Sequence, residues 1–405
     1  MTMPEPAPIL ICGAGIGGLA LALALAKAGR TSIVLEQRHS FDAAGAGIQL
    51  GPNGVRVLQR LGLAEVLRPA VGVPDALAVH HGGSGRTLAV LPLGRWIATR
   101  HGAPYWVAHR GDLHAVLAAA ASAEPRITLR LGFALASVTQ HGDGVQAKSL
   151  GGDVAAGGAL VGADGLWSVV RRSILPGHDP QFVGATAART VIPVAAAGRL
   201  ALPAVGLWLS PGVNVVHYPV RSGTEIAVVV IATEAWKGIG WDAEADRASL
   251  IARLAAFHSS LTDPLAMAPG WRKWALYRLP PLPNWSAGRI TLIGDSAHPM
   301  LPHLAQGGVL ALEDAVALAD ALAAHPGNAA QAFLAFEAKR RRRAARVQAM
   351  SRLNGRIFHL PPSLSWARDG VLRLVPGAWL MAGYDWLYGW QPGADTTGTR
   401  AAANP

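Results

Sequence analysis

The chain opens with a strand, a glycine-rich turn, a helix and a second strand, an order that constrains the fold more than any other part of the sequence. Ile9–Cys12 is a short apolar run, and Gly13, Gly15 and Gly18 follow it at the spacing G-x-G-x-x-G. In such a turn the first glycine permits a tight bend, the second lets the backbone approach a pyrophosphate, and the third lets the helix pack on the strand. Glu36 ends the next apolar run, where a carboxylate can accept hydrogen bonds from ribose hydroxyls. These residues predict a parallel α/β sheet that binds a dinucleotide.

A second segment, about 280 residues further along, narrows the type of dinucleotide. Residues 289–293 form another apolar strand pattern, and Gly294 and Asp295 follow it directly. A carboxylate at the end of a strand can accept hydrogen bonds from a ribityl or ribose hydroxyl. A lone G-x-G-x-x-G is a weak signal, whereas its pairing with a distant Gly-Asp strand end indicates FAD. The alternative, a glycine-rich turn with a surface Glu36, does not explain why strands, helix and acid occur in this order.

The composition limits the other classes of protein to be considered. An excess of 36 Lys+Arg over 25 Asp+Glu leaves open either nucleic-acid binding or a basic enzyme whose ligands are anions. The densest basic run, 339–343, has no interleaved aromatic residues for base stacking, so we expect a solvated helix face there. One cysteine, residues 1–8 without signal-peptide character, and no run of about 20 apolar residues favour a cytoplasmic protein. The histidines are scattered without ligand spacing, so no metal site is expected.

The predicted elements alternate along the chain between two kinds of domain. We expect FAD-binding segments at 1–75, 101–180 and 276–335, substrate-domain segments at 76–100 and 181–275, and a helical region at 336–405. Helices are expected at 110–123, 242–258 and 309–324, antiparallel strands within 127–151, and further strands at 190–194, 204–209, 213–220 and 225–233. The fold class is therefore α/β: a Rossmann-like FAD-binding domain with an interleaved mixed β-sheet substrate domain and C-terminal helices. The last ten residues are expected to be disordered.

Further motifs complete a family pattern: GAGIQLGPNG at 45–54, HRGDL at 109–113, GADG at 162–165, VHYP at 216–219, the segment 294–314, and YDWLYGW at 384–390. Together with the glycine fingerprint, they resemble the single-component FAD-dependent aromatic hydroxylases, the class that contains 4-hydroxybenzoate hydroxylase. The similarity is greatest to the branch of salicylate hydroxylase, 3-hydroxybenzoate 6-hydroxylase and 6-hydroxynicotinate 3-monooxygenase. It covers roughly residues 8–390.

The resemblance implies a set of residues that hold the FAD. Arg110 would contact the pyrophosphate, although a surface arginine at a helix start is the simpler alternative. Asp164 would fix a loop beside the FAD and the nicotinamide, or serve only as a turn residue. A helix beginning near residue 307 would direct its N–H groups at the flavin ring. The implied cofactor-binding residues are Gly13, Gly15, Gly17, Gly18, Glu36, Gln49, Arg110, Asp164, Asp295, Pro299, Gly307 and Gly308.

The resemblance also implies the reaction. NADH or NADPH reduces the FAD, and dioxygen then adds to give a C4a-hydroperoxyflavin, an electrophile that attacks an electron-rich ring. Such a site needs a hydrogen-bond acceptor or base near a substrate hydroxyl and a pocket that excludes water. The predicted function is therefore the hydroxylation of a phenolic or N-heteroaromatic, acidic substrate by an FAD-dependent NAD(P)H monooxygenase.

The catalytic candidates lie where this chain departs from its relatives. Asn214 occupies the position at which the branch usually carries a histidine, and an amide cannot act as a base at neutral pH. Strand alternation places Tyr218 on the same face as Asn214 and places His217 on the other, so His217 is as readily a structural histidine. His303 stands where many relatives have an aromatic residue; it either takes the base role or fills the aromatic position. Either one of these groups replaces the missing base, or the substrate needs none.

Substrate binding is assigned by the same resemblance to Gln49, Arg189, Asn214 and Tyr218, with Arg189 as the anchor for a substrate carboxylate. The expected partners are a small aromatic substrate and dioxygen, with no nucleic acid and no stable membrane attachment, in a monomer or homodimer. Two alternatives remain: an epoxidase or oxidase acting on a larger apolar substrate with the same cofactor, and a flavoprotein without enzymatic activity.

Overall fold

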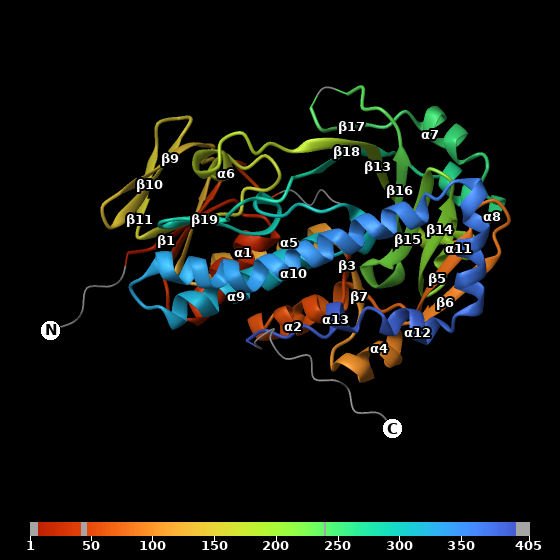
Figure 1. Cartoon of the computed structure of the whole chain (residues 1–405), viewed down its shortest axis with the longest axis horizontal. Coiled ribbons are helices and arrows are strands. Elements are labelled where there is room, and N and C mark those ends of the chain that lie inside the picture. The colour runs from red at the N-terminus through yellow and green to blue at the C-terminus, as the bar shows by residue number, and fades with distance from the viewer. Residues whose placement is uncertain (1–6, 42–46, 239, 394–405) are drawn as a thin grey trace.

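The computed structural model describes residues 7–41, 47–238 and 240–393 (Figure 1). Gly45 and Ala46 of the GAGIQLGPNG motif lie outside the described residues, as do all of the last ten residues, for which disorder was expected. The remaining motif residues all lie within them.

A six-stranded sheet carries both segments from which FAD binding was predicted. Its strands are parallel except for β19, which pairs antiparallel with β20. Both neighbours of β1 align with it residue for residue, so Ile9 pairs with Ala159 on one side and with Ser32 on the other. In sheet order the strands are β19 (Ser286–Ala287), β20 (Ile290–Leu292), β12 (Ala159–Gly162), β1 (Ile9–Cys12), β2 (Ser32–Glu36) and β8 (Ile127–Leu131).

Helices cover this sheet because its strands are apolar on both faces. The helix α1 (Ile16–Lys27) follows β1 and packs against α5 (Arg110–Ala123) and α9 (Gly307–Ala324). Most of α1 is buried, which is why an Ala/Leu sequence without a polar stripe forms a stable helix here. The short α6 (Val169–Ile174) begins after Ser168, whose side chain accepts a hydrogen bond from the Arg171 N–H.

The segment 127–151 differs from the expectation of antiparallel strands throughout. β8 joins the parallel sheet at its edge beside β2. Only the strands after it form an antiparallel sheet: β9 (Leu135–His141), β10 (Gly144–Ser149) and β11 (Val154–Gly157). The sequence of β8 does not reveal its partner, because pairing with β2 is a tertiary contact.

An eight-stranded sheet forms the other half of the molecule, on the right of Figure 1. Its pairs are antiparallel except for β14 with β5. The strands 76–92 lie in this sheet with the strands of 181–278, although many residues separate them in the chain. In sheet order they are β17 (Asp242–Glu244), β18 (Arg272–Arg278), β13 (Gln181–Pro193), β16 (Glu225–Thr233), β15 (Val213–Val220), β14 (Ala204–Ser210), β5 (Ala76–His81) and β6 (Thr87–Pro92).

One face of this sheet packs on α7 (Arg247–Leu254) and α8 (Ser259–Ala266). The expected single helix over 242–258 is therefore wrong at both ends. Residues 242–244 pair with β18, Asp246 caps α7 by accepting from the Ser249 N–H at 3.0 Å, and α7 ends at Leu254. The opposite face packs toward α12 (Gly377–Ala382) and α13 (Asp385–Tyr388).

Short elements join the two halves. A three-stranded sheet contains β3 (Gly47–Leu50), β7 (Trp106–His109) and β4 (Val71–Gly72). The remaining helices are α2 (Pro52–Leu61), α3 (Ala64–Leu67), α4 (Gly94–His101), α10 (Ala329–Phe358) and α11 (Pro362–Leu374). The 3-10 turns are η1 (Arg68–Ala70), η2 (Val194–Ala196), η3 (Gly198–Ala201), η4 (Arg221–Gly223), η5 (Gly294–Ser296) and η6 (Pro302–Leu304). The 30-residue α10 runs from beside the six-stranded sheet to the eight-stranded one (Figure 1).

Candidate active site

The glycine turn after β1 has the geometry that a pyrophosphate requires. Gly13 has φ +103°, and a Cβ added there would lie 2.5 Å from the Ala163 carbonyl oxygen. A Cβ added at Gly18 would lie 1.9 Å from the Gly13 carbonyl oxygen, so the helix packs against the turn only because residue 18 is glycine. Beside Gly15, in contrast, no atom of the described residues other than Gly15 and its two chain neighbours is found within 4 Å of the added Cβ. This open space at the N-terminus of α1 fits a phosphate group.

Glu36 lies at the end of β2, next to that turn. Its carboxylate accepts hydrogen bonds from the backbone N–H of Ala14 at 2.9 Å and of Arg38 at 3.0 Å. The first bond fixes the carboxylate beside the glycine turn, and Glu36 is only half-buried. Its position fits the binding of a ribose.

Asp295 lies across the sheet from Glu36, on the turn that follows β20. Its side chain is exposed, whereas Gly294, Ser296, Ala297 and His298 around it are buried. The enclosing protein raises the pKa of Asp295, and electrostatic interactions with His298 and Arg110 oppose this rise. An accessible carboxylate within such an enclosure fits a hydroxyl-rich ligand.

A buried ionic network holds this turn in place. The Asp314 carboxylate accepts hydrogen bonds from the Gly294 N–H at 2.9 Å, from His298 Nε2 at 2.6 Å and from Arg340 Nε at 2.7 Å. Burial would raise the pKa of Asp314, but His298 and Arg340 hold it well below its usual value. The second carboxylate of the network, Glu313, forms an ion pair with Arg340 at 2.8 Å.

The expectation of a solvated helix face at 339–343 is therefore wrong for two of its arginines. Arg340 is 2 % exposed and Arg343 pairs with Glu313 at 2.6 Å, so both belong to the network beneath the turn. The sequence could not predict these ion pairs, because they depend on how α9, which carries the acids, crosses α10, which carries the arginines.

Asp164 serves the local structure of its own loop. Its carboxylate accepts hydrogen bonds from the Ser168 hydroxyl at 2.5 Å and from the Val170 N–H at 3.0 Å. Burial raises the pKa of Asp164, and these hydrogen bonds oppose the rise. These contacts fix the loop after β12, which both expectations for Asp164 require.

The elements that would border the flavin ring meet at the start of α9. A Cβ added at Gly308 would lie 2.8 Å from Ile48, so β3 passes directly beside the first turn of α9. Gln49 follows on β3, and its Oε1 accepts a hydrogen bond from the Tyr105 hydroxyl at 2.6 Å. Pro299 is buried, and its carbonyl accepts from Gln348 Nε2 at 2.9 Å. Tyr105 and Gln348 were not foreseen from the sequence.

The eight-stranded sheet presents one face toward this region. Asn214, Val216 and Tyr218 share that face of β15, because every second side chain of a strand points to the same side. A Cβ added at Gly47 of β3 would lie 2.2 Å from the Tyr218 ring, so this tyrosine joins the two halves of the molecule. Burial raises the pKa of Tyr218 well above its usual value, which keeps the phenol protonated and able to donate.

Arg189 lies on the same face two strands away. It pairs in register with Val229, which pairs in turn with Val216, and directly opposed residues in antiparallel strands share a face. Its guanidinium lies 5.0 Å from the Trp274 ring centroid, and its Nε is buried with no partner among the described residues. The charge of Arg189 lowers the pKa of Tyr218, so the two groups are electrostatic neighbours.

His217 lies on the opposite face of β15. Its ring packs close above Gly206 and 6.4 Å from the Trp208 ring, and it is buried. Burial lowers its pKa to about 3, so the imidazole is neutral at ordinary pH. This placement accords with a structural histidine, the alternative that strand alternation had left open.

His303 lies on the flavin side of the site, in η6. Both of its ring nitrogens are buried and have no partner among the described residues, and burial lowers its pKa to about 4. Its ring lies 5.6 Å from that of His359, whose Nε2 lies 2.8 Å from Asn214 Oδ1. The structure thus brings Asn214, His303 and His359 together, and only His359 was absent from the sequence-based candidates.

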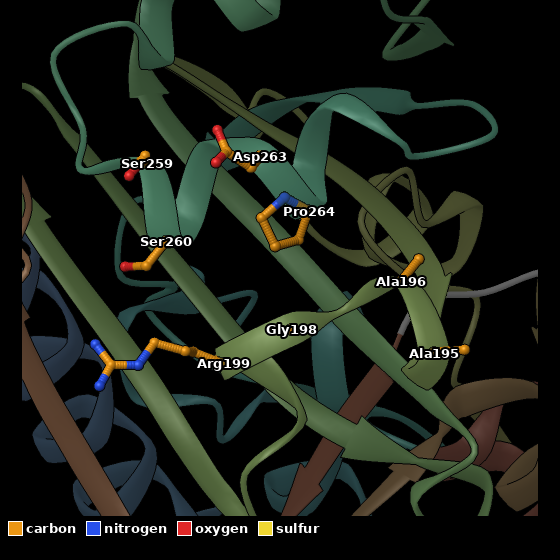
Figure 2. Close-up of a pocket in the computed structure, with 8 residues that line it drawn as sticks. All are labelled: Ala195, Ala196, Gly198, Arg199, Ser259, Ser260, Asp263 and Pro264. Atoms are coloured by element: carbon orange, nitrogen blue, oxygen red, sulfur yellow. The ribbon is translucent and has the colours of Figure 1, made fainter.

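Within the described ranges, no group of His, Cys, Asp or Glu could hold a metal ion. Across the same residues, no helix has both the length and the apolarity to cross a membrane. A separate hollow of about 490 Å³ lies between η3 and α8, on the side of the eight-stranded sheet away from α12, and Figure 2 shows its lining, which includes Arg199, Ser260 and Asp263. None of the expected flavin or substrate residues lines it, so it is not the site described above.

Together with the fold, three kinds of feature define a flavoprotein with a Rossmann-like FAD site: the glycine turn, the carboxylates of Glu36 and Asp295, and the N-termini of α1 and α9. The chain matches the model of the FAD binding domain family over residues 6–351 and belongs to that family. It is 34 % identical to a 3-hydroxybenzoate 6-hydroxylase from Klebsiella oxytoca over 90 % of this chain and 92 % of the relative. It is 33 % identical to a 6-hydroxynicotinate 3-monooxygenase from Bordetella bronchiseptica, covering 85 % of this chain and 91 % of the relative. A solved salicylate hydroxylase substrate complex is 25 % identical and superposes with a TM-score of 0.82 over 97 % of this chain and 98 % of that one.

These comparisons confirm the resemblance, the fold class and the cofactor predicted from the sequence. The protein is an FAD-dependent aromatic monooxygenase that uses NAD(P)H. The relatives do not favour the alternatives of an epoxidase or oxidase, or of a flavoprotein without activity. When bound, FAD supplies the redox chemistry with NAD(P)H and dioxygen, and the protein supplies binding, orientation and the exclusion of water.

Proposed function

We propose that this enzyme hydroxylates a small aromatic or N-heteroaromatic ring that carries a carboxylate and a ring oxygen. The proposal is supported above all by Arg189, a guanidinium with a buried, unpartnered Nε among the described residues, on the same sheet face as Tyr218. Burying an arginine without an anionic partner is unfavourable, and a substrate carboxylate would provide that partner. The named substrates of the similar hydroxylases, 3-hydroxybenzoate and 6-hydroxynicotinate, are acids of this kind.

In this proposal the remaining residues orient the ring. Tyr218 donates its hydroxyl hydrogen to a substrate oxygen, and Gln49, held by Tyr105, borders the ring from the side of β3. His303 lies near the flavin edge and takes the role of base or hydrogen-bond partner, because neither of its ring nitrogens has a partner in the described part of the chain. For the cofactor we propose Gly13, Gly15, Gly17 and Gly18 at the phosphates, Glu36, Arg110 and Asp295 at the sugar and pyrophosphate, Asp164 in a supporting loop, and Pro299, Gly307 and Gly308 at the flavin ring.

The proposal is tested by measuring NADH and NADPH oxidation by the FAD-loaded enzyme across hydroxybenzoates, hydroxynicotinates and aminobenzoates, with product mass recorded. We expect at least one acid to accelerate oxidation and to gain one oxygen atom. If no acid does so while a neutral aromatic does, the acidic substrate class is refuted.

The role of Arg189 is tested with 3-hydroxybenzoate and its uncharged analogue 3-hydroxybenzamide. A hydrogen bond to a charged group is worth about 1.5–3 kcal/mol, so Arg189→Gln should raise KM for the acid roughly 10- to 100-fold relative to the amide. Arg272→Gln is the matched control, because Arg272 lies on the next strand near the same Trp274 ring but is 64 % exposed. An unchanged acid-to-amide ratio in Arg189→Gln would remove it as the anchor.

A further inference from the structure

The helix α10 fixes the position of the flavin-side segment 299–303 through three hydrogen bonds. Gln348 donates to the Pro299 carbonyl at 2.9 Å, Ser351 to the Leu301 carbonyl at 2.7 Å, and Asn354 to the His303 carbonyl at 3.3 Å. The donors are spaced by three residues, so they lie along one side of the helix. The C-cap of α10, His359, is therefore placed relative to this segment by a rigid element.

At that end, His359 reaches the substrate-facing side of β15. Its Nε2 lies 2.8 Å from Asn214 Oδ1. An amide oxygen can only accept a hydrogen bond, so the imidazole must be the donor and carry a hydrogen on Nε2. Asn214 is 0 % exposed, and its Nδ2 has no partner among the described residues. Leaving a buried NH₂ group without an acceptor is unfavourable, and an oxygen of a ligand would offset that cost.

We propose that His359 is a positioning residue that orients Asn214, so that Asn214 Nδ2 donates a hydrogen bond to the ring oxygen of the substrate. This inference rests on the proposed function, in which Arg189 binds the carboxylate and leaves the ring oxygen for another donor. The amide cannot remove a proton; it favours a ring oxygen that is carbonyl-like or already anionic, because donation to the charged form stabilises that form.

The donation from His359 has two effects on Asn214. It fixes the side-chain amide in one of its two orientations, and it polarises the amide, which strengthens the bond donated from Nδ2. Position 214 lacks the histidine that is usual in the family, and His359 at the end of α10 supplies an imidazole that contacts Asn214 and not the substrate. Without the hydrogen bond from His359, the side-chain amide of Asn214 could present either its NH₂ group or its oxygen to the substrate.

The first test needs no ligand. The FAD-loaded enzyme is labelled with ¹⁵N-histidine, and the His359 signals are assigned from their loss in His359→Gln. We expect His359 to carry its hydrogen on Nε2, with Nδ1 unprotonated. A hydrogen on Nδ1 with Nε2 unprotonated would mean that the amide is turned the other way and offers an acceptor to the site, and it would overturn the proposal.

The second test compares 3-hydroxybenzoate with benzoate, which lacks the ring oxygen, by the perturbation of the flavin absorbance on binding. His359→Leu should weaken 3-hydroxybenzoate binding about fivefold and leave benzoate binding within about twofold, because one neutral hydrogen bond is worth about 1 kcal/mol. His359→Gln, whose amide can still donate to Asn214, should restore most of the affinity. His325→Leu is the control: His325 caps α9 and contacts the Ala321 carbonyl at 2.9 Å.

Equal weakening of both ligands in His359→Leu, or no rescue by Gln, would show a structural role only and overturn the proposal. The acid used is one that the panel above identifies, paired with its analogue that lacks the ring oxygen; if no acid of that panel binds the wild-type enzyme, the substrate class of the proposed function fails. The histidine tautomer then decides the orientation of Asn214 independently.

Discussion

Replacing Asp314 with Asn tests how the turn carrying Asp295 is held. The carboxylate accepts three hydrogen bonds, from Gly294, His298 and Arg340, at 2.6–2.9 Å. Asp314→Asn keeps the size of the side chain, removes its charge and turns one oxygen into a donor. Removing one member of a buried ion pair costs about 3–5 kcal/mol. Because Glu313 still pairs with Arg340 at 2.8 Å, we expect the lower end of this range, a loss of about 3 kcal/mol in the free energy of unfolding.

The matched control is Asp320→Asn on the same helix. Asp320 also pairs with an arginine, Arg60, at 2.8 Å, but the two side chains are 36 % and 40 % exposed. An exposed pair of this kind contributes only about 0–1 kcal/mol. Both variants are compared with wild type by urea unfolding of the FAD-free protein, and FAD affinity is measured separately by fluorescence. If the two variants lose stability to within about 0.5 kcal/mol of each other, the network does not hold the turn as we infer.

Three further predictions concern the cofactor and the dependence of stability on pH. Gly15→Val should abolish FAD retention without unfolding the protein, since space for the side chain exists only while no phosphate is there; a variant that purifies with a full complement of flavin contradicts this. Asp295→Ala should weaken FAD binding roughly tenfold or more through the loss of a charged acceptor, and unchanged affinity by titration would remove its assigned role. Burial lowers the pKa of His217 to about 3 from an unfolded value of about 6.5, so the unfolded chain takes up the proton first. The stability from this group is fully present above about pH 6.5 and is lost as pH falls toward 3, by up to about 5 kcal/mol; His217→Leu should flatten the decline, and an equally steep curve for the variant would refute the cause.

Local patterns were sufficient to predict the elements nearest the cofactor. The turn at Gly13 and the close packing at Gly18 depend on residues adjacent in the chain, and β15, β16 and α5 begin and end where expected. Local sequence patterns gave wrong predictions where pairing with a distant strand decides the structure. β8 joins a parallel sheet and residues 242–244 form a strand because of distant partners, which no local periodicity encodes.

The same division applies to the candidate site. Strand alternation correctly separated Tyr218 from His217, because side chains on a strand alternate with period two. It could not show that Arg340 reaches Asp314, since that contact depends on the crossing of α9 and α10. Nor could it bring His359 to Asn214, which lies 145 residues earlier.

By itself, the sequence determined the fold of the glycine turn, because a few neighbouring residues set its backbone geometry. The cofactor and the class of reaction were also predicted from the sequence, through motifs spread along the chain and their resemblance to a family of hydroxylases. Only the tertiary structure decided which polar groups line the candidate site and which form buried ion pairs. Those outcomes depend on where α10 ends and on which face of the eight-stranded sheet meets the start of α9, and both are consequences of packing between segments far apart in the chain.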